Sequence, residues 1–83
     1  MATSVQDLDR VYRTVAAILD TSTEMITDAS SPDTIAAWDS LNHLNLVMAL
    51  EQEFGVSLSA GDALVMSNVA SIRTILRQYG VEC

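Results

Sequence analysis

The chain has no lysine, one cysteine, one proline and three glycines among its 83 residues. The single cysteine, Cys83, excludes an intramolecular disulfide, and we expect it to be exposed and able to link two chains on oxidation. So few glycines and prolines favour long regular elements over a loop-rich fold. Aromatic residues make up only 5% of the chain, which argues against a base-stacking surface for nucleic acid.

Positive charge is also scarce, and its distribution is uneven. The chain has 11 acidic residues and a net charge of −7, and residues 14–72 contain eight acidic residues but no basic one. Such a chain lacks the electrostatic footprint that binds DNA or RNA. The negative middle segment either steers basic partners or serves solubility, and composition alone leaves both open. The basic residues lie near the ends of the chain: Arg10, Arg13, Arg73 and Arg77.

No basic segment followed by an apolar run opens the chain, and no apolar stretch is long enough to cross a bilayer. We therefore expect a cytoplasmic protein without a membrane partner. At 83 residues and 49% hydrophobic content, the chain predicts one folded domain, residues 1–83. A domain of this size buries a limited core and has little room for an enclosed active site.

Apolar residues recur at helical spacing in three long segments. The first segment covers residues 4–19, with Ser4 as N-cap and Asp7 as its capping-box partner. The second begins at residue 39 or 40, runs to 54, and is ended by Gly55. The third begins after residue 67 or 68 and includes Tyr79 on its buried face, before Gly80 ends it.

The shorter segments complete a prediction of an all-α fold. Ser59 can cap a short helix over residues 60–65, after an extended connector at 56–58. Residues 20–38 are rich in turn formers, so we expect a long connection with one helical turn near 22–26. The sequence thus predicts an all-α four-helix bundle with three main helices, one short third helix and a long connection between the first two.

Helical periodicity also predicts which side chains are buried. The second helix has more apolar residues than one buried face needs, so Leu41, Val47 and Met48 are expected partly outside the core. Arg73 and Arg77 are expected to point outward. A cavity is possible between the second and third helices, near Met48, Leu64, Val65 and Met66. Met25, Ile26 and Ile35 would anchor the connection. The expected core is Leu8, Tyr12, Val15, Leu19, Leu44, Leu46, Leu50, Phe54, Leu58, Val69, Ile72 and Leu76.

Ser40 is the residue most suited to carry chemistry. An Asp and a Ser before an apolar helix are ordinary N-cap residues, yet a helix N-terminus also suits a negatively charged group. A hydrolase would need His43, the only histidine, as the base for Ser40, but no further triad member or oxyanion hole is evident. One Cys and one His cannot form a zinc site, and no calcium-loop spacing occurs, so no metal is expected.

The run Asp39-Ser40-Leu41, followed by the segment from Leu46 to Val56, resembles the acyl carrier protein family, and the match continues at Leu58, Asp62, Val69 and Ile72. The resemblance implies that Ser40 receives 4′-phosphopantetheine from coenzyme A through a phosphopantetheinyl transferase. It implies that Asp39 helps to position the transferase's metal-bound substrate or its basic residues, and that Leu41 belongs to the same site. The protein would then be a monomeric carrier of acyl thioesters and not an enzyme.

The same resemblance implies a recognition surface on the second helix for acyl-loading and acyl-processing enzymes. Apolar contacts would come from Leu41, Val47 and Met48, and pairs with basic partner residues from Glu51 and Glu53. Rim pairs of this kind set association rate and choice of partner.

This chain departs from the common fatty-acid carriers in having Trp38 before the motif and Asn42, His43 and Asn45 where acids are usual. The variant resembles discrete carriers of specialised pathways, of the polyketide or hybrid peptide type. Three alternatives stay open: a peptidyl or aminoacyl carrier, an unmodified helical adaptor that binds through the second helix, and a small hydrolase that uses Ser40 and His43.

Overall fold

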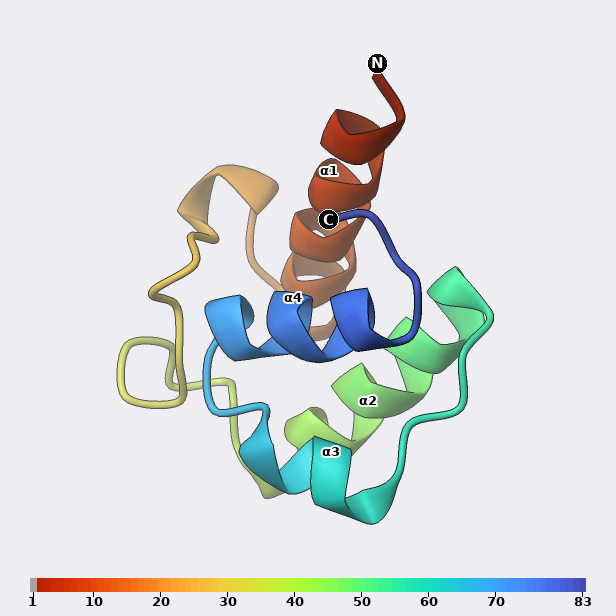
Figure 1. The fold of residues 1–83 in the computed structure, drawn as a ribbon. Coiled ribbons are helices and arrows are strands. Elements are labelled where there is room, and N and C mark those ends of the chain that lie inside the picture. The colour runs from red at the N-terminus through yellow and green to blue at the C-terminus, as the bar shows by residue number, and fades with distance from the viewer. Residues whose placement is uncertain (1) are drawn as a thin grey trace.

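The computed structural model describes the backbone of residues 2–83 and the side chains of residues 9–83. Four α-helices follow one another, α1 (Ala2–Ile18), α2 (Ser40–Phe54), α3 (Ala60–Val65) and α4 (Val69–Gln78), with a 3₁₀ turn, η1 (Thr23–Met25), between the first two. Residues 2–83 contain no strand. The predicted all-α four-helix bundle, with a short third helix and a long connection before α2, is confirmed (Figure 1).

Local capping signals fix most helix boundaries. The Asp39 carboxylate accepts the N–H of Asn42 at 2.9 Å and caps α2, and Gly55 ends that helix in the left-handed region with φ 65°. Because α1 already begins at Ala2, the prediction that Ser4 starts this helix is wrong. The predicted capping partnership of Ser4 with Asp7 lies outside the described side chains.

The two later helices begin where the sequence predicts. Ser59 and Asp62 form a capping box at α3, in which each side chain accepts a backbone N–H of the other residue. The Asn68 side chain accepts the N–H of Ser71 at 2.7 Å and caps α4. Residues 56–58 form the predicted connector between α2 and α3 and contain neither helix nor strand.

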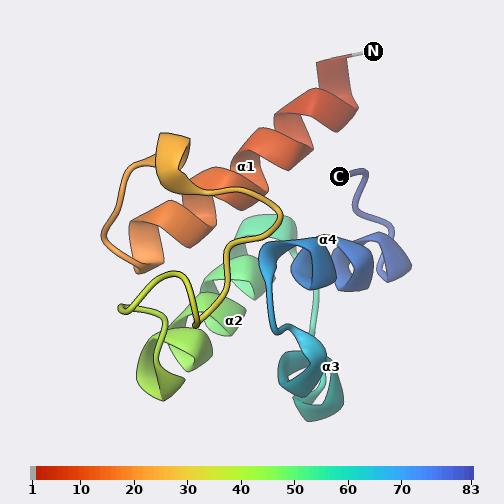
Figure 2. The same cartoon turned by 90° about the vertical axis from the view of Figure 1, so that its left-hand side faces the viewer.

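The core lies where α1, α2 and α4 meet the long connection (Figures 1 and 2). Seven of the expected core residues are buried: Val15, Leu19, Leu46, Leu50, Val69, Ile72 and Leu76. Three more, Tyr12, Phe54 and Leu58, are half-buried and pack against this core. The side chain of Leu8 lies outside the described residues. Hydrophobic burial of this set is the main stabilising contribution.

Two predictions on α2 are wrong, and both errors have the same cause. Leu44 was expected inside but is 58% exposed, whereas Val47 was expected partly outside but is 7% exposed. Successive helix residues rotate by about 100°, so turning Leu46, Val47 and Leu50 inward carries Leu44 round to the outer face. Periodicity could not decide between these faces because both are apolar.

The long connection, residues 19–39, packs against the helices and does not hang free (Figure 2). Trp38 and Ile26 are buried and Ile35 is half-buried, but the predicted anchor Met25 is 66% exposed. The carbonyl oxygens of Asp28 and Ser30 accept backbone N–H groups from the first turn of α4 at 3.0 and 3.1 Å. The connection therefore closes the start of α4, whose first amides have no partner within the helix.

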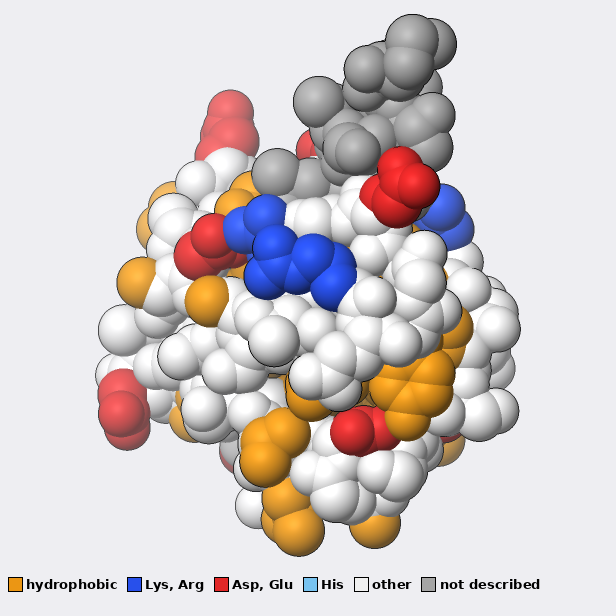
Figure 3. All heavy atoms as spheres, viewed as in Figure 1, with side chains coloured by type: hydrophobic (Ala, Val, Ile, Leu, Met, Phe, Trp, Pro, Cys, Tyr) orange, Lys and Arg blue, Asp and Glu red, His pale blue; other side chains and the backbone are white. Residues whose placement is uncertain are grey.

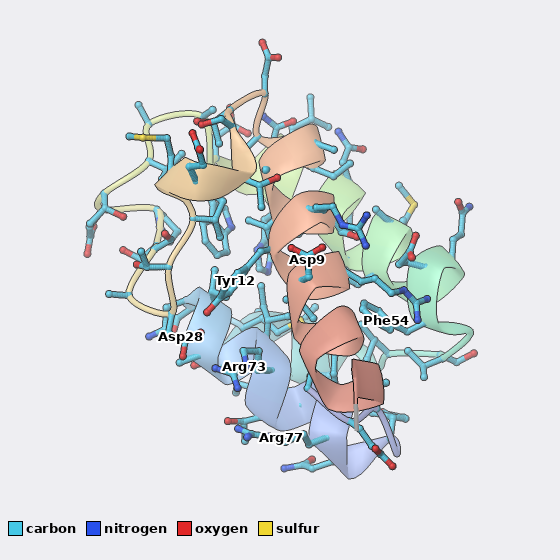
Figure 4. All side chains as sticks on the ribbon, turned by 90° about the horizontal axis from the view of Figure 1, so that it is seen from above. Asp9, Tyr12, Asp28, Phe54, Arg73 and Arg77 are labelled. Atoms are coloured by element: carbon cyan, nitrogen blue, oxygen red, sulfur yellow. The ribbon has the colours of Figure 1, made fainter. Side chains whose placement is uncertain are left out.

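A polar cluster ties this connection to α1 and α4 (Figure 4). The Tyr12 hydroxyl donates to Asp28 at 2.9 Å, and the Arg73 guanidinium contacts the other Asp28 oxygen at 2.5 Å and the Cys83 carbonyl at 2.6 and 2.8 Å. The predictions of an outward Arg73 and an exposed Cys83 are wrong, since both are half-buried. Long-range pairing with the connection draws Arg73 inward.

Charge and burial in this cluster shift the pKa values of Asp28 and Tyr12. Burial opposes ionisation of Asp28, but the hydrogen bonds from Arg73 and Tyr12 outweigh it and hold the pKa of the carboxyl below its ordinary value. Burial and the hydrogen bond to Asp28 raise the pKa of Tyr12 above its ordinary value.

Tyr79, at the end of α4, was expected on the buried face but is 42% exposed. The helix ends at Gln78, and the phenol donates a hydrogen bond to Asp62.

Candidate functional site

Ser40 is exposed and is the first residue of α2. The Asp39 side chain beside it takes the N–H of Asn42, and the Asp39 carbonyl takes the N–H of His43 at 2.8 Å. Among the described residues, no acceptor contacts the amide N–H groups of Ser40 and Leu41. The Ser40 hydroxyl therefore lies at a helix N-terminus with two donors still available, which is a favourable place for an anionic oxygen.

An open groove of about 480 Å³ lies beside Ser40. One wall comes from the end of the connection and the start of α2, and the other from the end of α3 and the residues after it. The predicted cavity between the second and third helices is thus an open surface groove, to which Leu64 and Met66 contribute but Met48 and Val65 do not. Its lining residues are Pro32, Trp38, Asp39, Ser40, His43, Leu64, Met66 and Ser67.

His43 reaches across this region and contacts both walls. Its Nδ1 accepts the indole N–H of Trp38 at 3.0 Å, and its Nε2 lies 2.8 Å from the carbonyl oxygen of Ala63 on α3. The Trp38 and His43 rings are nearly parallel, with an interplanar angle of 20°. Both imidazole nitrogens are therefore engaged by groups other than the Ser40 hydroxyl, so this arrangement offers Ser40 no general base.

The outer surface of α2 is apolar. Leu41, Leu44 and Met48 are 68, 58 and 49% exposed and fall within one stripe of the helix. Leu64 and Val65 on α3 add exposed fractions of 84 and 55%. We call these five residues the outer apolar face. In the space-filling view, hydrophobic side chains gather over α3 at the lower end, while arginine side chains gather over α4 (Figure 3).

The other residues predicted to bind partners face inward or have partners within the chain. Val47 is buried in the core. The Glu51 carboxylate accepts the N–H of Leu58 at 2.8 Å and so organises the connector to α3. Glu53 forms an ion pair with Arg10 at 2.8 Å, and the Arg10 guanidinium lies 4.6 Å from the centre of the Phe54 ring. Leu41 and Met48 remain as exposed predicted contacts, joined by Leu44.

Among the residues whose side chains are described, no group of three or more His, Cys, Asp and Glu side chains is placed to hold a metal ion. None of the helices in residues 2–83 combines the length and apolar character needed to span a bilayer. A scan against models of known protein families found no match to this chain, and a search of curated proteins found none either.

Sequence reasoning missed two features of this site. The exposure of Leu44 was hidden by the apolar surplus of α2. The contacts of His43 were missed because one partner, Ala63, lies 20 residues away and contributes only a carbonyl oxygen. The indole of Trp38, five residues before His43, was the available signal, since a buried indole needs an acceptor.

Proposed function

We propose that this protein is an acyl carrier, in which Ser40 holds a 4′-phosphopantetheine arm and presents a thioester-bound acyl group to partner enzymes. The observation that supports this best is the position of Ser40: exposed, first in α2, and at the mouth of a groove of about 480 Å³. The run Asp39-Ser40-Leu41, which resembles the carrier motif, lies at this point. We further propose a specialised pathway of the polyketide or hybrid peptide type.

The residues around Ser40 fit the phosphopantetheine group that the proposal requires. In the transfer, the Ser40 oxygen forms a bond to the phosphorus that bears pantetheine in coenzyme A, and the pyrophosphate bond breaks. Adenosine bisphosphate leaves with the bonding electron pair, and the serine proton passes to the transferase. The amides of Ser40 and Leu41 and the helix dipole then stabilise the phosphodiester charge. Asp39 is placed to contact the transferase.

The proposal assigns partner contact to the outer apolar face. This face begins one residue after Ser40 and contains no charged side chain, and Glu51 and Glu53 are bound within the chain. Exposed apolar side chains that cluster beside a reactive group are typical of an interaction site. Partners are therefore expected to contact α2 and α3 mainly through apolar surfaces, with a smaller electrostatic contribution to binding.

The test is the intact mass of the protein after incubation with coenzyme A and a broad-specificity phosphopantetheinyl transferase. We expect the parent to gain one phosphopantetheine and Ser40→Ala to gain none. Ser57→Ala, which removes another exposed serine, should react as the parent does. A folded parent that never gains the mass, or gain by Ser40→Ala, would contradict the proposal.

An unmodified adaptor is the second candidate, because the outer apolar face would serve it equally well. The two functions differ in their need for Ser40. An adaptor would keep its partner binding in Ser40→Ala, whereas a carrier loses every acyl transfer. The mass measurement on the parent therefore separates them, whether the cargo is an acyl, aminoacyl or peptidyl group.

A further inference from the structure

His43 is the only histidine and Trp38 the only tryptophan of the chain, and they are bonded to each other. An indole N–H only donates, so the Nδ1 atom of His43 must be the acceptor and carry no proton. A carbonyl oxygen only accepts, so Nε2 must carry the proton that points to Ala63 at 2.8 Å. These two partners assign one form of the ring: neutral, with its proton on Nε2.

Through its two hydrogen bonds, this ring joins three segments of the chain. Trp38 belongs to the connection and is 2% exposed, His43 belongs to α2, and Ala63 belongs to α3. We call this contact the Trp38–His43–Ala63 bridge. It matters most for α3, because that helix has six residues and none of them is buried. A short helix without buried side chains depends on individual polar contacts for its position.

The bridge also spans the groove beside Ser40. Trp38 and His43 line one wall, and Leu64, which follows Ala63, lies on the other. We propose that neutral His43 is a positioning residue that holds α3 at a fixed distance from Ser40, so that the groove keeps the shape that receives the arm. The assignment of the arm rests on the proposed function, whereas the bridge and its single tautomer do not.

Protonation of His43 would end this role. An imidazolium carries N–H groups on both nitrogens, so its Nδ1–H would face the indole N–H, and the buried indole would lose its acceptor. Two carboxylates bear on this region. Asp39 lines the same groove from the start of α2, and Asp62 precedes Ala63 on α3, where Ser59 and Tyr79 bind its carboxylate. The groove is therefore expected to lose its fixed wall when the ring becomes charged.

The first arm of the experiment needs no coenzyme A. Long-range proton–nitrogen spectra of the uniformly labelled protein report the tautomer of a single imidazole, and the indole N–H gives one further signal. We expect the Nε2-protonated form. We also expect the indole signal and the amide signals of α3 to move with pH along the same curve as the imidazole ring protons. The proposal would be overturned by an Nδ1-protonated ring, or by α3 amide signals that do not change with pH along the curve of the imidazole ring protons.

The second arm compares variants in the transfer of phosphopantetheine from coenzyme A. His43→Ala removes both bonds, and we expect the KM for the carrier to rise about fivefold with kcat nearly unchanged. The glutamine of His43→Gln can accept one hydrogen bond and donate another. This variant should therefore have a KM close to that of the parent, and its indole signal should no longer change with pH. Thr14→Ala, a half-buried polar residue outside this groove, is the matched control.

The outcomes separate the two proposals. If the parent is modified and folded His43→Ala has the parent's KM, the positioning role is wrong while the carrier function stands. If the parent is never modified, the carrier function and the groove's role both fail, and the tautomer measurement still decides whether the bridge exists. Amide spectra of each variant establish that it is folded before its kinetics are compared.

Discussion

The helices α2 and α4 use similar apolar residues in opposite ways. In α4 the apolar side chains Val69, Ile72, Ile75 and Leu76 are all buried, and the opposite side is polar. In α2 the inward residues Leu46, Val47 and Leu50 are buried, but a second apolar stripe faces outward. A helix that only completes a core needs one apolar stripe, as α4 has. The second stripe of α2 lies outside the described core, which supports a role in binding.

The surroundings of α4 and of Ser40 also differ in how their polar and apolar side chains are used. Around α4, charged groups are bonded to one another, as Asp28 is to Arg73, and they fix the connection to the helix. Around Ser40, the described surface combines an open groove with exposed leucines. Under the proposed function, stability and partner recognition depend on different parts of a very small domain, and substitutions should separate them.

The largest effect is expected from a leucine pair on α2 that differs only in the direction it faces. Leu50→Ala empties a fully buried site and should lower the free energy of unfolding by about 2–5 kcal/mol. Leu44→Ala, at a side chain that is 58% exposed, should change it by less than about 0.5 kcal/mol. Urea unfolding followed by circular dichroism measures both. Equal losses for the two variants would show that the outer stripe is part of the core.

A smaller effect is expected at the polar cluster of α4. The folded state lowers the pKa of Asp28, so its carboxylate stabilises the fold above the ordinary pKa and loses this effect as pH falls through the lowered pKa. Asp28→Asn should reduce stability by about 1 kcal/mol at pH 7, a modest value because the side chain is 45% exposed. The difference from the parent should shrink in acid.

The control for this pH dependence is Asp33→Asn, an exposed carboxylate in the same connection. It should leave the stability curve unchanged between pH 7 and acid. A constant deficit of Asp28→Asn at every pH would mean that the amide disturbs packing and that the charge itself contributes little.

Much of this fold was predictable because its signals are local. Asp39, Ser59 and Asn68 cap the helices that follow them, and Gly55 adopts the left-handed conformation that ends α2. Each of these signals operates within a few residues, so sequence spacing alone reveals it. The position of Ser40 at the start of α2 follows from the same reasoning.

The remaining features depend on partners that are distant in sequence. Arg73 turns inward to a carboxylate 45 residues away, and Glu53 turns toward an arginine 43 residues away. Arg73 was expected to point outward and Glu53 to pair with a partner protein, because a helical pattern gives the direction of a side chain but not which groups lie near it. The choice between Leu44 and Val47 likewise depended on how α2 packs against α1.

The smallest effect, and the one that bears most directly on the outer stripe, is expected in partner binding. Leu44→Ser should leave folding intact but lower kcat/KM for the transferase about threefold to tenfold, as expected for a peripheral apolar contact. Glu53→Gln should change kcat/KM by less than about twofold, since its carboxylate is already paired with Arg10. Because the proposed partner contacts on α2 are apolar, raising the salt concentration should weaken docking of the parent and of Leu44→Ser to the same small extent. If Glu53→Gln were the more damaging variant and its effect vanished in salt, recognition would depend on charge, and the difference between α2 and α4 would need another explanation.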